Sequence, residues 1–311
     1  MKTINRLALI ILFASAVPKV SFAVDATWDG GVSGGGTGWL TAANWLGDVL
    51  PGTMDRIIFG IAGTATTIGI NMNGATNNGP NNEAVASITL DATDAVNRTI
   101  NNSSSTASGI LTINGASGIL VENDSTHTLT FSNGTTQAMN VVLTSSGTVG
   151  GTGAITINST VSGSGFGFTK IGDDTLTLNN SNTYSGGTLI NLGTIAATHD
   201  GALGLGNVSL TAATVTLTLS GGATNNYIAD NVDLSIVTGT TVNMNFTGTD
   251  VIGSLTVNGL AQAPGVYGAG SFPELLGTGT LTVIPEPATY VMLFIGAGLL
   301  FGVQRLHRKA S

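Results

Sequence analysis

Short runs of alternating apolar and polar residues recur along the middle of the chain. In Leu111-Thr112-Ile113-Asn114 and Leu176-Thr177-Leu178-Asn179, branched apolar residues alternate with threonine, and asparagine follows. Alternation with a period of two predicts strands that bury one face and expose the other to water. The same core, complete or varied, recurs at residues 88–90, 129–131, 155–158, 217–219, 255–258 and 281–283.

The spacing of these runs predicts a solenoid. Cores begin at residues 88, 111, 129, 155 and 176, and the gaps from 176 to 217 and from 217 to 255 are close to twice the same step of about 20 residues. A β-rich repeat of this length is typical of a parallel β-helix, in which each repeat forms one coil. The following asparagine suits a turn with left-handed backbone geometry. Because the steps are unequal, a β-sandwich of hairpins is the alternative.

The first 23 residues have the pattern of a secretory signal peptide. Basic residues precede an apolar run over residues 7–17, and Ser21-Phe22-Ala23 supplies the small residues of a cleavage site. We expect cleavage between Ala23 and Val24. An uncleaved anchor is the alternative, although an apolar run of this length is short for a membrane span.

Residues 24–60 differ from the rest of the chain because they hold all three tryptophans, Trp28, Trp39 and Trp45. A solenoid must cover its first open coil, and large aromatic side chains can do this. We therefore interpret residues 24–60 as a cap on a solenoid body that spans residues 61–284. A platform of exposed rings that stack on sugars is the alternative. At the other end, residues 265–283 are expected to close the last coil.

The last 27 residues have three parts in a fixed order. Pro285-Glu286-Pro287 comes first, 16 uncharged residues from Ala288 to Val303 follow, and Arg305, Arg308 and Lys309 form a basic end. At about 1.5 Å per helical residue, residues 288–303 span about 24 Å, most of a hydrocarbon core of about 30 Å. The positive-inside rule places the basic end in the cytoplasm and the extended Pro-Glu-Pro segment outside.

This arrangement resembles the PEP-CTERM sorting tail of exported bacterial proteins. The resemblance implies that residues 285–311 are read by a membrane-embedded sorting protease of the exosortase type, often in bacteria that make extracellular polysaccharide. A plain C-terminal membrane anchor with a chance Pro-Glu-Pro sequence is the alternative.

A second resemblance covers residues 166–195, which read FGFTKIGDDTLTLNNSNTYSGGTLINLGTI. The Lys-x-Gly turn, the Thr-Leu-Thr-Leu strand, the Asn-Thr-Tyr-x-Gly-Gly-Thr turn and the later Gly-Thr are similar to the autotransporter-associated β-strand repeat. Asp173 and Asp174 stand where that family more often has glycine and a small residue. The resemblance implies a right-handed β-helix of the autotransporter-passenger type, and the motif occurs in full once.

The charge of the body excludes some partners. Between Val24 and Ile284 the basic residues are Arg56, Arg98 and Lys170, whereas all 17 acidic residues of the chain except Glu286 lie there. Nucleic acids and anionic membrane surfaces bind clustered basic residues, so we expect neither as a partner of the body. The chain has no cysteine, so its fold does not depend on disulfides.

Candidate catalytic groups are few. His127 and His199 are isolated along the sequence, with His127 in a predicted polar strand, and no metalloprotease, nucleophile-elbow or phosphate-loop motif occurs. Polysaccharide-active β-helices use clustered carboxylates, and three pairs are close in sequence: Asp91 with Asp94, Glu122 with Asp124, and Asp173 with Asp174. Residues 172–176 faintly resemble a calcium-binding nonapeptide, but that motif requires tandem copies. We expect no metal and no cofactor.

The sequence thus predicts an exported, non-enzymatic, all-β protein with an N-terminal signal peptide and a single C-terminal transmembrane helix. Its precursor is anchored in the inner membrane and then sorted to the cell surface or the extracellular matrix, where it has a structural or adhesive role. The expected partners are the sorting protease, the membrane before processing, and extracellular polysaccharide. The alternative function is a polysaccharide lyase or glycosidase on the same fold.

Overall fold

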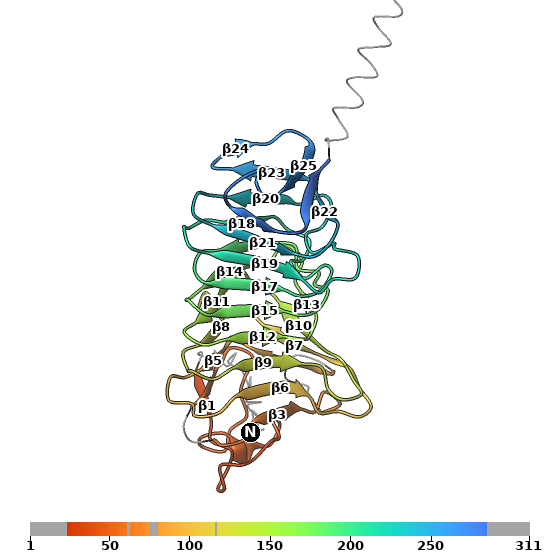
Figure 1. The fold of residues 1–311 in the computed structure, drawn as a ribbon. Coiled ribbons are helices and arrows are strands. Elements are labelled where there is room, and N and C mark those ends of the chain that lie inside the picture. The colour runs from red at the N-terminus through yellow and green to blue at the C-terminus, as the bar shows by residue number, and fades with distance from the viewer. Residues whose placement is uncertain (1–23, 61–62, 75–76, 78–79, 116, 285–311) are drawn as a thin grey trace, which may run out of the picture.

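The computed structural model describes residues 24–60, 63–74, 77, 80–115 and 117–284. The strands of this part form a stack of coils in which each coil lies on the one before it (Figure 1). Two long sheets run along the stack, and nearly all of their strand pairs are parallel. Parallel pairing of strands from successive coils is the arrangement of a β-helix and excludes the sandwich of hairpins.

The eleven-stranded sheet forms one face of every coil. Its strands, in spatial order, are β1 (Asp25–Trp28), β2 (Arg56–Phe59), β5 (Ser87–Leu90), β8 (Ile119–Asn123), β11 (Gly147–Gly151), β14 (Phe168–Ile171), β16 (Thr188–Ile190), β18 (Val208–Leu210), β20 (Asp233–Ile236), β23 (Ser254–Val257) and β24 (Leu260–Ala261).

The nine-stranded sheet forms a second face, and Figure 1 shows most of its strands one above another. In chain order they are β3 (Thr67–Ile70), β6 (Arg98–Asn102), β9 (Leu129–Ser132), β12 (Ile155–Ile157), β15 (Thr175–Leu178), β17 (Thr194–Ala197), β19 (Thr216–Ser220), β21 (Thr241–Asn245) and β26 (Leu275–Gly277).

Two shorter sheets complete the molecule. One contains β4 (Asn82–Val85), β7 (Gly109–Ile113), β10 (Met139–Leu143) and β13 (Val161–Ser162), and the other contains β22 (Thr249–Ile252), β25 (Gly265–Gly268) and β27 (Thr280–Val283). The segment between β1 and β2 includes a 3-10 helix, η1 (Ala42–Asn44). Among the described residues no helix is long and apolar enough to cross a membrane, and the predicted span 288–303 lies outside them.

The alternation in the sequence sets which side chains face inward. In β15 and β19 the leucines are buried and the threonines are partly exposed. Leu176 pairs with Ile195, and Ile195 pairs with Leu217, so branched apolar residues stack along the axis of the coil. Each is fully buried. Burying such a side chain contributes about 1.5–3 kcal/mol, and the same column continues through Ile155 to Leu129.

The register corrects the spacing that the sequence suggested. Leu129, Ile155, Leu176, Ile195 and Leu217 pair in turn within the nine-stranded sheet, so the step from 176 to 217 is indeed two coils. The cores at 88 and 255 instead belong to the eleven-stranded sheet, and the core at 111 belongs to β7. Steps between cores of different sheets are therefore not coil lengths.

The asparagines after the strand cores also differ from expectation. Asn258 has the left-handed backbone conformation (φ 52°), but Asn114, Asn158 and Asn179 do not. Asn179 instead donates through Nδ2 to Oδ1 of Asn158 in the preceding coil, at 3.2 Å. At these positions asparagine links neighbouring coils through its side chain.

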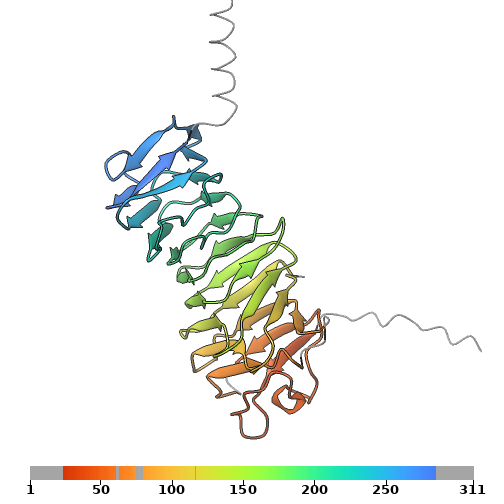
Figure 2. The same cartoon turned by 90° about the vertical axis from the view of Figure 1, so that its right-hand side faces the viewer.

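Both ends of the described stack differ from its middle. Trp28, Trp39 and Trp45 are fully buried, and the ring of Trp45 packs edge-on against the other two with centroids 4.9 and 5.0 Å away. Their burial leaves no exposed indole for stacking on a sugar. At the far end, seen at the top of Figure 2, β24 and β25 pair antiparallel with β23 and β27, which ends the parallel ladder.

Candidate functional site

The sorting and processing residues are mostly outside the described part of the chain. Ala23, Pro285, Glu286, Pro287, Arg305, Arg308 and Lys309 lie in residues 1–23 and 285–311. Val24 is the first described residue, and its side chain is exposed. An exposed position directly before β1 is accessible to a protease, but the cleavage itself stays a prediction.

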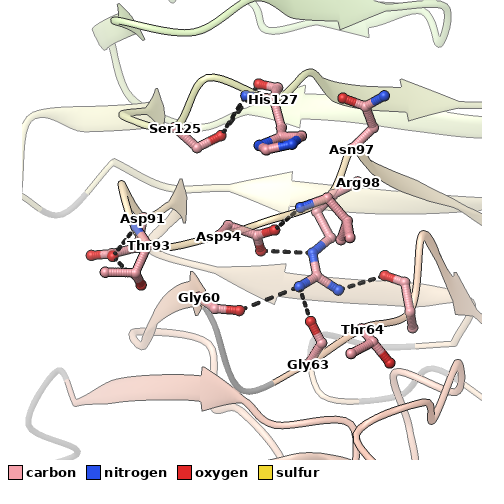
Figure 3. A network of polar contacts seen from close by, with 12 residues as sticks. Gly60, Gly63, Thr64, Asp91, Thr93, Asp94, Asn97, Arg98, Ser125 and His127 are labelled. Atoms are coloured by element: carbon pink, nitrogen blue, oxygen red, sulfur yellow. Dashed lines mark hydrogen bonds and ion pairs between the residues drawn. The ribbon is translucent and has the colours of Figure 1, made fainter.

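The carboxylate pair Asp91 and Asp94 does not converge on one site (Figure 3). Asp91 is partly exposed and accepts hydrogen bonds from the backbone N and the hydroxyl of Thr93, which lower its pKa. Asp94 is buried and binds Nε of Arg98 at 2.7 Å. The guanidinium of Arg98 also donates to the carbonyl oxygens of Gly60, Gly63 and Ala65.

Arg98 is therefore a structural residue. It is fully buried, and its charge is neutralised by Asp94 and solvated by carbonyl oxygens from the segment that joins β2 to β3. Its guanidinium also lies 5.9 Å from the centre of the Phe59 ring. A buried cation needs this full set of partners, and the carbonyl groups among them lie 33 to 38 residues earlier in the chain.

The other two carboxylate pairs lie apart from each other as well. Glu122 faces outward on β8, and its pKa is raised by partial burial and by Asp124. Asp173 and Asp174 lie in the turn between β14 and β15, where Asp174 accepts a hydrogen bond from the backbone N of its neighbour Thr175. Acid catalysis on a glycan requires two carboxyls that face one sugar from defined distances. Glu122 lies on β8 and the pair Asp173 and Asp174 follows β14, and β11 lies between these two strands.

Lys170 precedes that turn with its side chain inside the coil. Its Nζ donates to the carbonyl oxygens of Ile171, Gly172 and Leu192, and burial lowers its pKa to about 8. The nearby carboxylates of Asp174 and Asp173 oppose this shift. The lysine thus ties the turn to the next coil, and this explains the Lys-x-Gly pattern physically.

The two histidines among the described residues, His127 and His199, both lie in turns. His127 lies between β8 and β9, so the expectation of a strand was wrong, and its backbone N donates to the hydroxyl of Ser125 (Figure 3). Nδ1 of His199 lies 2.7 Å from the carbonyl oxygen of Asp200. Within the described residues, no three groups of metal-ligating type come together.

Two buried carboxyls were missed by the sequence reading. Glu83 on β4 accepts hydrogen bonds from Nε1 of Trp39 (3.3 Å) and Nδ2 of Asn77 (2.6 Å), and burial raises its pKa to about 7. Asp250 on β22 accepts from the backbone N of Tyr227 and of Ile228, and burial likewise raises its pKa to about 7. An acidic residue in an inward position of a strand is the signal that identifies both.

Buried asparagines at inward strand positions were also missed by the sequence analysis. Asn123 occupies an inward position at the end of β8, and its Nδ2 donates to the carbonyl oxygens of His127 and Ala154. Asn102 at the end of β6 does the same with Ala107 and Ala138. Each side chain joins its own turn to the next coil, so its own buried amide group is hydrogen-bonded.

The described coils carry neutral polar groups on the surface of the eleven-stranded sheet. A shallow hollow of about 510 Å³ lies on the eleven-stranded sheet, over strands β11, β14, β16 and β18. Four glycines are among its lining residues, and its polar side chains include those of Thr148, Thr169, Ser209 and Asn207. Hydroxyl and amide groups of this kind can hydrogen-bond a sugar chain, but they supply no general acid or base at neutral pH.

Comparison with known proteins agrees with this arrangement. The family described as the passenger-associated transport repeat matches residues 168–197, which form β14 to β17. The resemblance of residues 166–195 to an autotransporter repeat is thereby confirmed.

A relative among characterised proteins is the adhesin BmaC autotransporter of Brucella suis biovar 1 (strain 1330). It is 33% identical over 194 residues, which cover 59% of this chain and 5% of the relative. The chain thus spans a small part of that protein's length. No solved structure matches the chain. The chain is therefore similar to autotransporter passengers in its repeat and to an adhesin over more than half its length.

Proposed function

We propose that the protein is a structural or adhesive β-solenoid of the cell surface or extracellular matrix. It is exported through its signal peptide, and an exosortase-type protease sorts it through Pro285-Glu286-Pro287. The helix 288–303 anchors the precursor in the inner membrane, with Arg305, Arg308 and Lys309 in the cytoplasm. The coil is right-handed, as in autotransporter passengers.

One observation carries the adhesive role: the described coils stack without interruption and present rows of neutral hydroxyl and amide groups. Candidate catalytic carboxylates are instead separated or used in turns and ion pairs. Similarity to an adhesin supports the same role. Extracellular polysaccharide is the proposed partner, held by hydrogen bonds in the hollow on the eleven-stranded sheet.

A triple substitution in the tail tests whether residues 285–311 act as a sorting signal or only as a membrane anchor. Pro285, Glu286 and Pro287 are all replaced by alanine in the native host, which leaves the apolar span and the basic end unchanged. A larger, membrane-bound species should accumulate, because insertion needs hydrophobicity and charge whereas sorting also needs the tripeptide. Pro264→Ala, which removes an exposed proline from the loop between β24 and β25, is the control and should be processed normally.

An unchanged product size and location in the triple variant would show that the tail is only an anchor. The adhesive role is tested separately, by binding of the purified exported protein to polysaccharide from the same host. The protein should bind this polysaccharide and release no new reducing ends from it. Release of reducing ends would favour the enzymatic alternative.

A further inference from the structure

The outward face of the nine-stranded sheet carries a column of threonines. Residues of eight successive strands pair in register through this column, one residue per coil. Six of the eight are threonine. In order they are Thr67, Thr99, Thr130, Thr156, Thr177, Ala196, Thr218 and Asn243.

A second threonine column runs beside the first. Thr175, Thr194, Thr216 and Thr241 pair in register on β15, β17, β19 and β21, each two residues before a member of the first column. Residues two apart on a strand point to the same side of the sheet. All four are partly exposed, so the two columns share one surface.

The two columns define a nearly rectangular lattice. Neighbouring strands of a sheet lie about 4.8 Å apart, and two residues along a parallel strand span about 6.6 Å. The seven intervals of the first column therefore extend over about 34 Å. Threonine is β-branched, so its side chain adopts few rotamers and the hydroxyl and methyl groups repeat with the backbone.

The chemistry of this face is uniform and uncharged. The chain has a net charge of −8, yet the strands β3, β6, β9, β12, β15, β17, β19 and β21 contain one charged residue, Arg98, which is fully buried. Their one aromatic residue, Phe131, is buried too. The face therefore lacks both the charges that bind ionic ligands and the exposed rings that stack on sugars.

We propose that this threonine face binds ice. The oxygen atoms on a prism face of hexagonal ice also repeat on a rectangular lattice, with a short repeat close to the strand spacing and a longer one close to the two-residue step. Threonine hydroxyls can hydrogen-bond water held at these spacings, and the methyl groups between them favour ordered water. A charge on the face would hold water in another arrangement, so the neutrality of the strands fits this ligand.

The test is the distribution of the protein between ice and liquid. The protein, purified as its native host exports it, is partly frozen in dilute solution, and the protein in each phase is measured against a carrier protein. Wild-type protein should be enriched in the ice. Thr177→Lys should reduce that enrichment to the level of the carrier, because it places a long charged chain in the centre of the first column.

Two controls make the result specific. Thr256→Lys puts the same charge on β23, facing outward from the eleven-stranded sheet and outside the hollow, and should leave the enrichment unchanged. Ala196→Thr completes a gap in the first column and should increase the enrichment. Thr156→Tyr, which keeps a residue favoured in strands, should also abolish it if Thr177→Lys fails to fold.

Equal partition of the wild-type protein and the carrier would overturn the proposal. So would an equal loss in Thr256→Lys and Thr177→Lys when circular dichroism shows both to be folded. Binding of the wild-type face to a crystalline glycan, lost in Thr177→Lys and without any enrichment in ice, would also overturn it and would assign the face to the proposed adhesive role.

Discussion

Glu83 gives a quantitative test of the packing between β4 and the tryptophan-rich segment 24–60. Its carboxyl is almost fully buried beside Trp39, and one of its oxygens, Oε2, has no hydrogen-bond partner within the described residues. Burial raises its pKa from 4.5 to about 7. In the folded protein the group therefore stays protonated through a pH range in which it is ionised in the unfolded chain.

The sign of the pH dependence follows from this difference. Between about pH 4.5 and about pH 7, the folded state binds more protons than the unfolded state, so the free energy of unfolding falls as pH rises. One pKa unit corresponds to about 1.4 kcal/mol, so Glu83 lowers stability by about 3 kcal/mol between pH 4 and pH 8. Glu83→Gln removes the titration and keeps an oxygen that can accept from Trp39.

Urea unfolding followed by tryptophan fluorescence measures this effect locally, because all three tryptophans lie in residues 24–60. The fluorescence transition of wild-type protein should move to lower urea between pH 4.5 and pH 7.5, and the shift should be smaller in Glu83→Gln. Asp250→Asn, at the other end of the stack, is the matched control and should leave the tryptophan transition unaltered. The same shift in wild type and Glu83→Gln would refute the assignment of the raised pKa to Glu83.

Three further outcomes are expected. Leu176→Ala should destabilise the protein by about 2–5 kcal/mol in chemical unfolding, whereas Leu189→Ala, whose side chain is partly exposed, should cost far less. Arg98→Met should be tolerated only together with Asp94→Asn, because the single change leaves a buried carboxylate without its cation; thermal unfolding of the single and double variants measures the coupling. Gly172→Ala should reduce the thermal stability of the protein, because Gly172 has a φ of 72° and a Cβ there would clash with the backbone of Gly151.

The sequence pattern was sufficient to predict the strands and their stacking into a parallel solenoid. Threonine and leucine alternate in β15 and β19, and the period of two determines which side is buried. The pattern could not assign each strand to a sheet, because similar cores at 88 and 111 belong to different faces. Sheet membership depends on the length of every turn between strands, and these turns have no common period.

The polar side chains inside the coil could not be predicted from the sequence either. Arg98 and Asp94 look like ordinary surface charges, and only the carbonyl groups of Gly60, Gly63 and Ala65 show why a cation is stable inside the coil. The threonine columns were visible as alternation. Their register, which makes them a surface lattice, required the pairing of strands 19 to 32 residues apart in the chain.

The mass of the mature protein from its native host tests the central proposal of sorted export most directly. Cleavage after Ala23 and removal of the membrane span should give a chain that begins at Val24 and lacks residues 288–311, and the triple alanine variant at residues 285–287 should keep them. A native product that begins at Met1, or one that retains Arg305, Arg308 and Lys309 in the wild-type protein, would contradict the proposal.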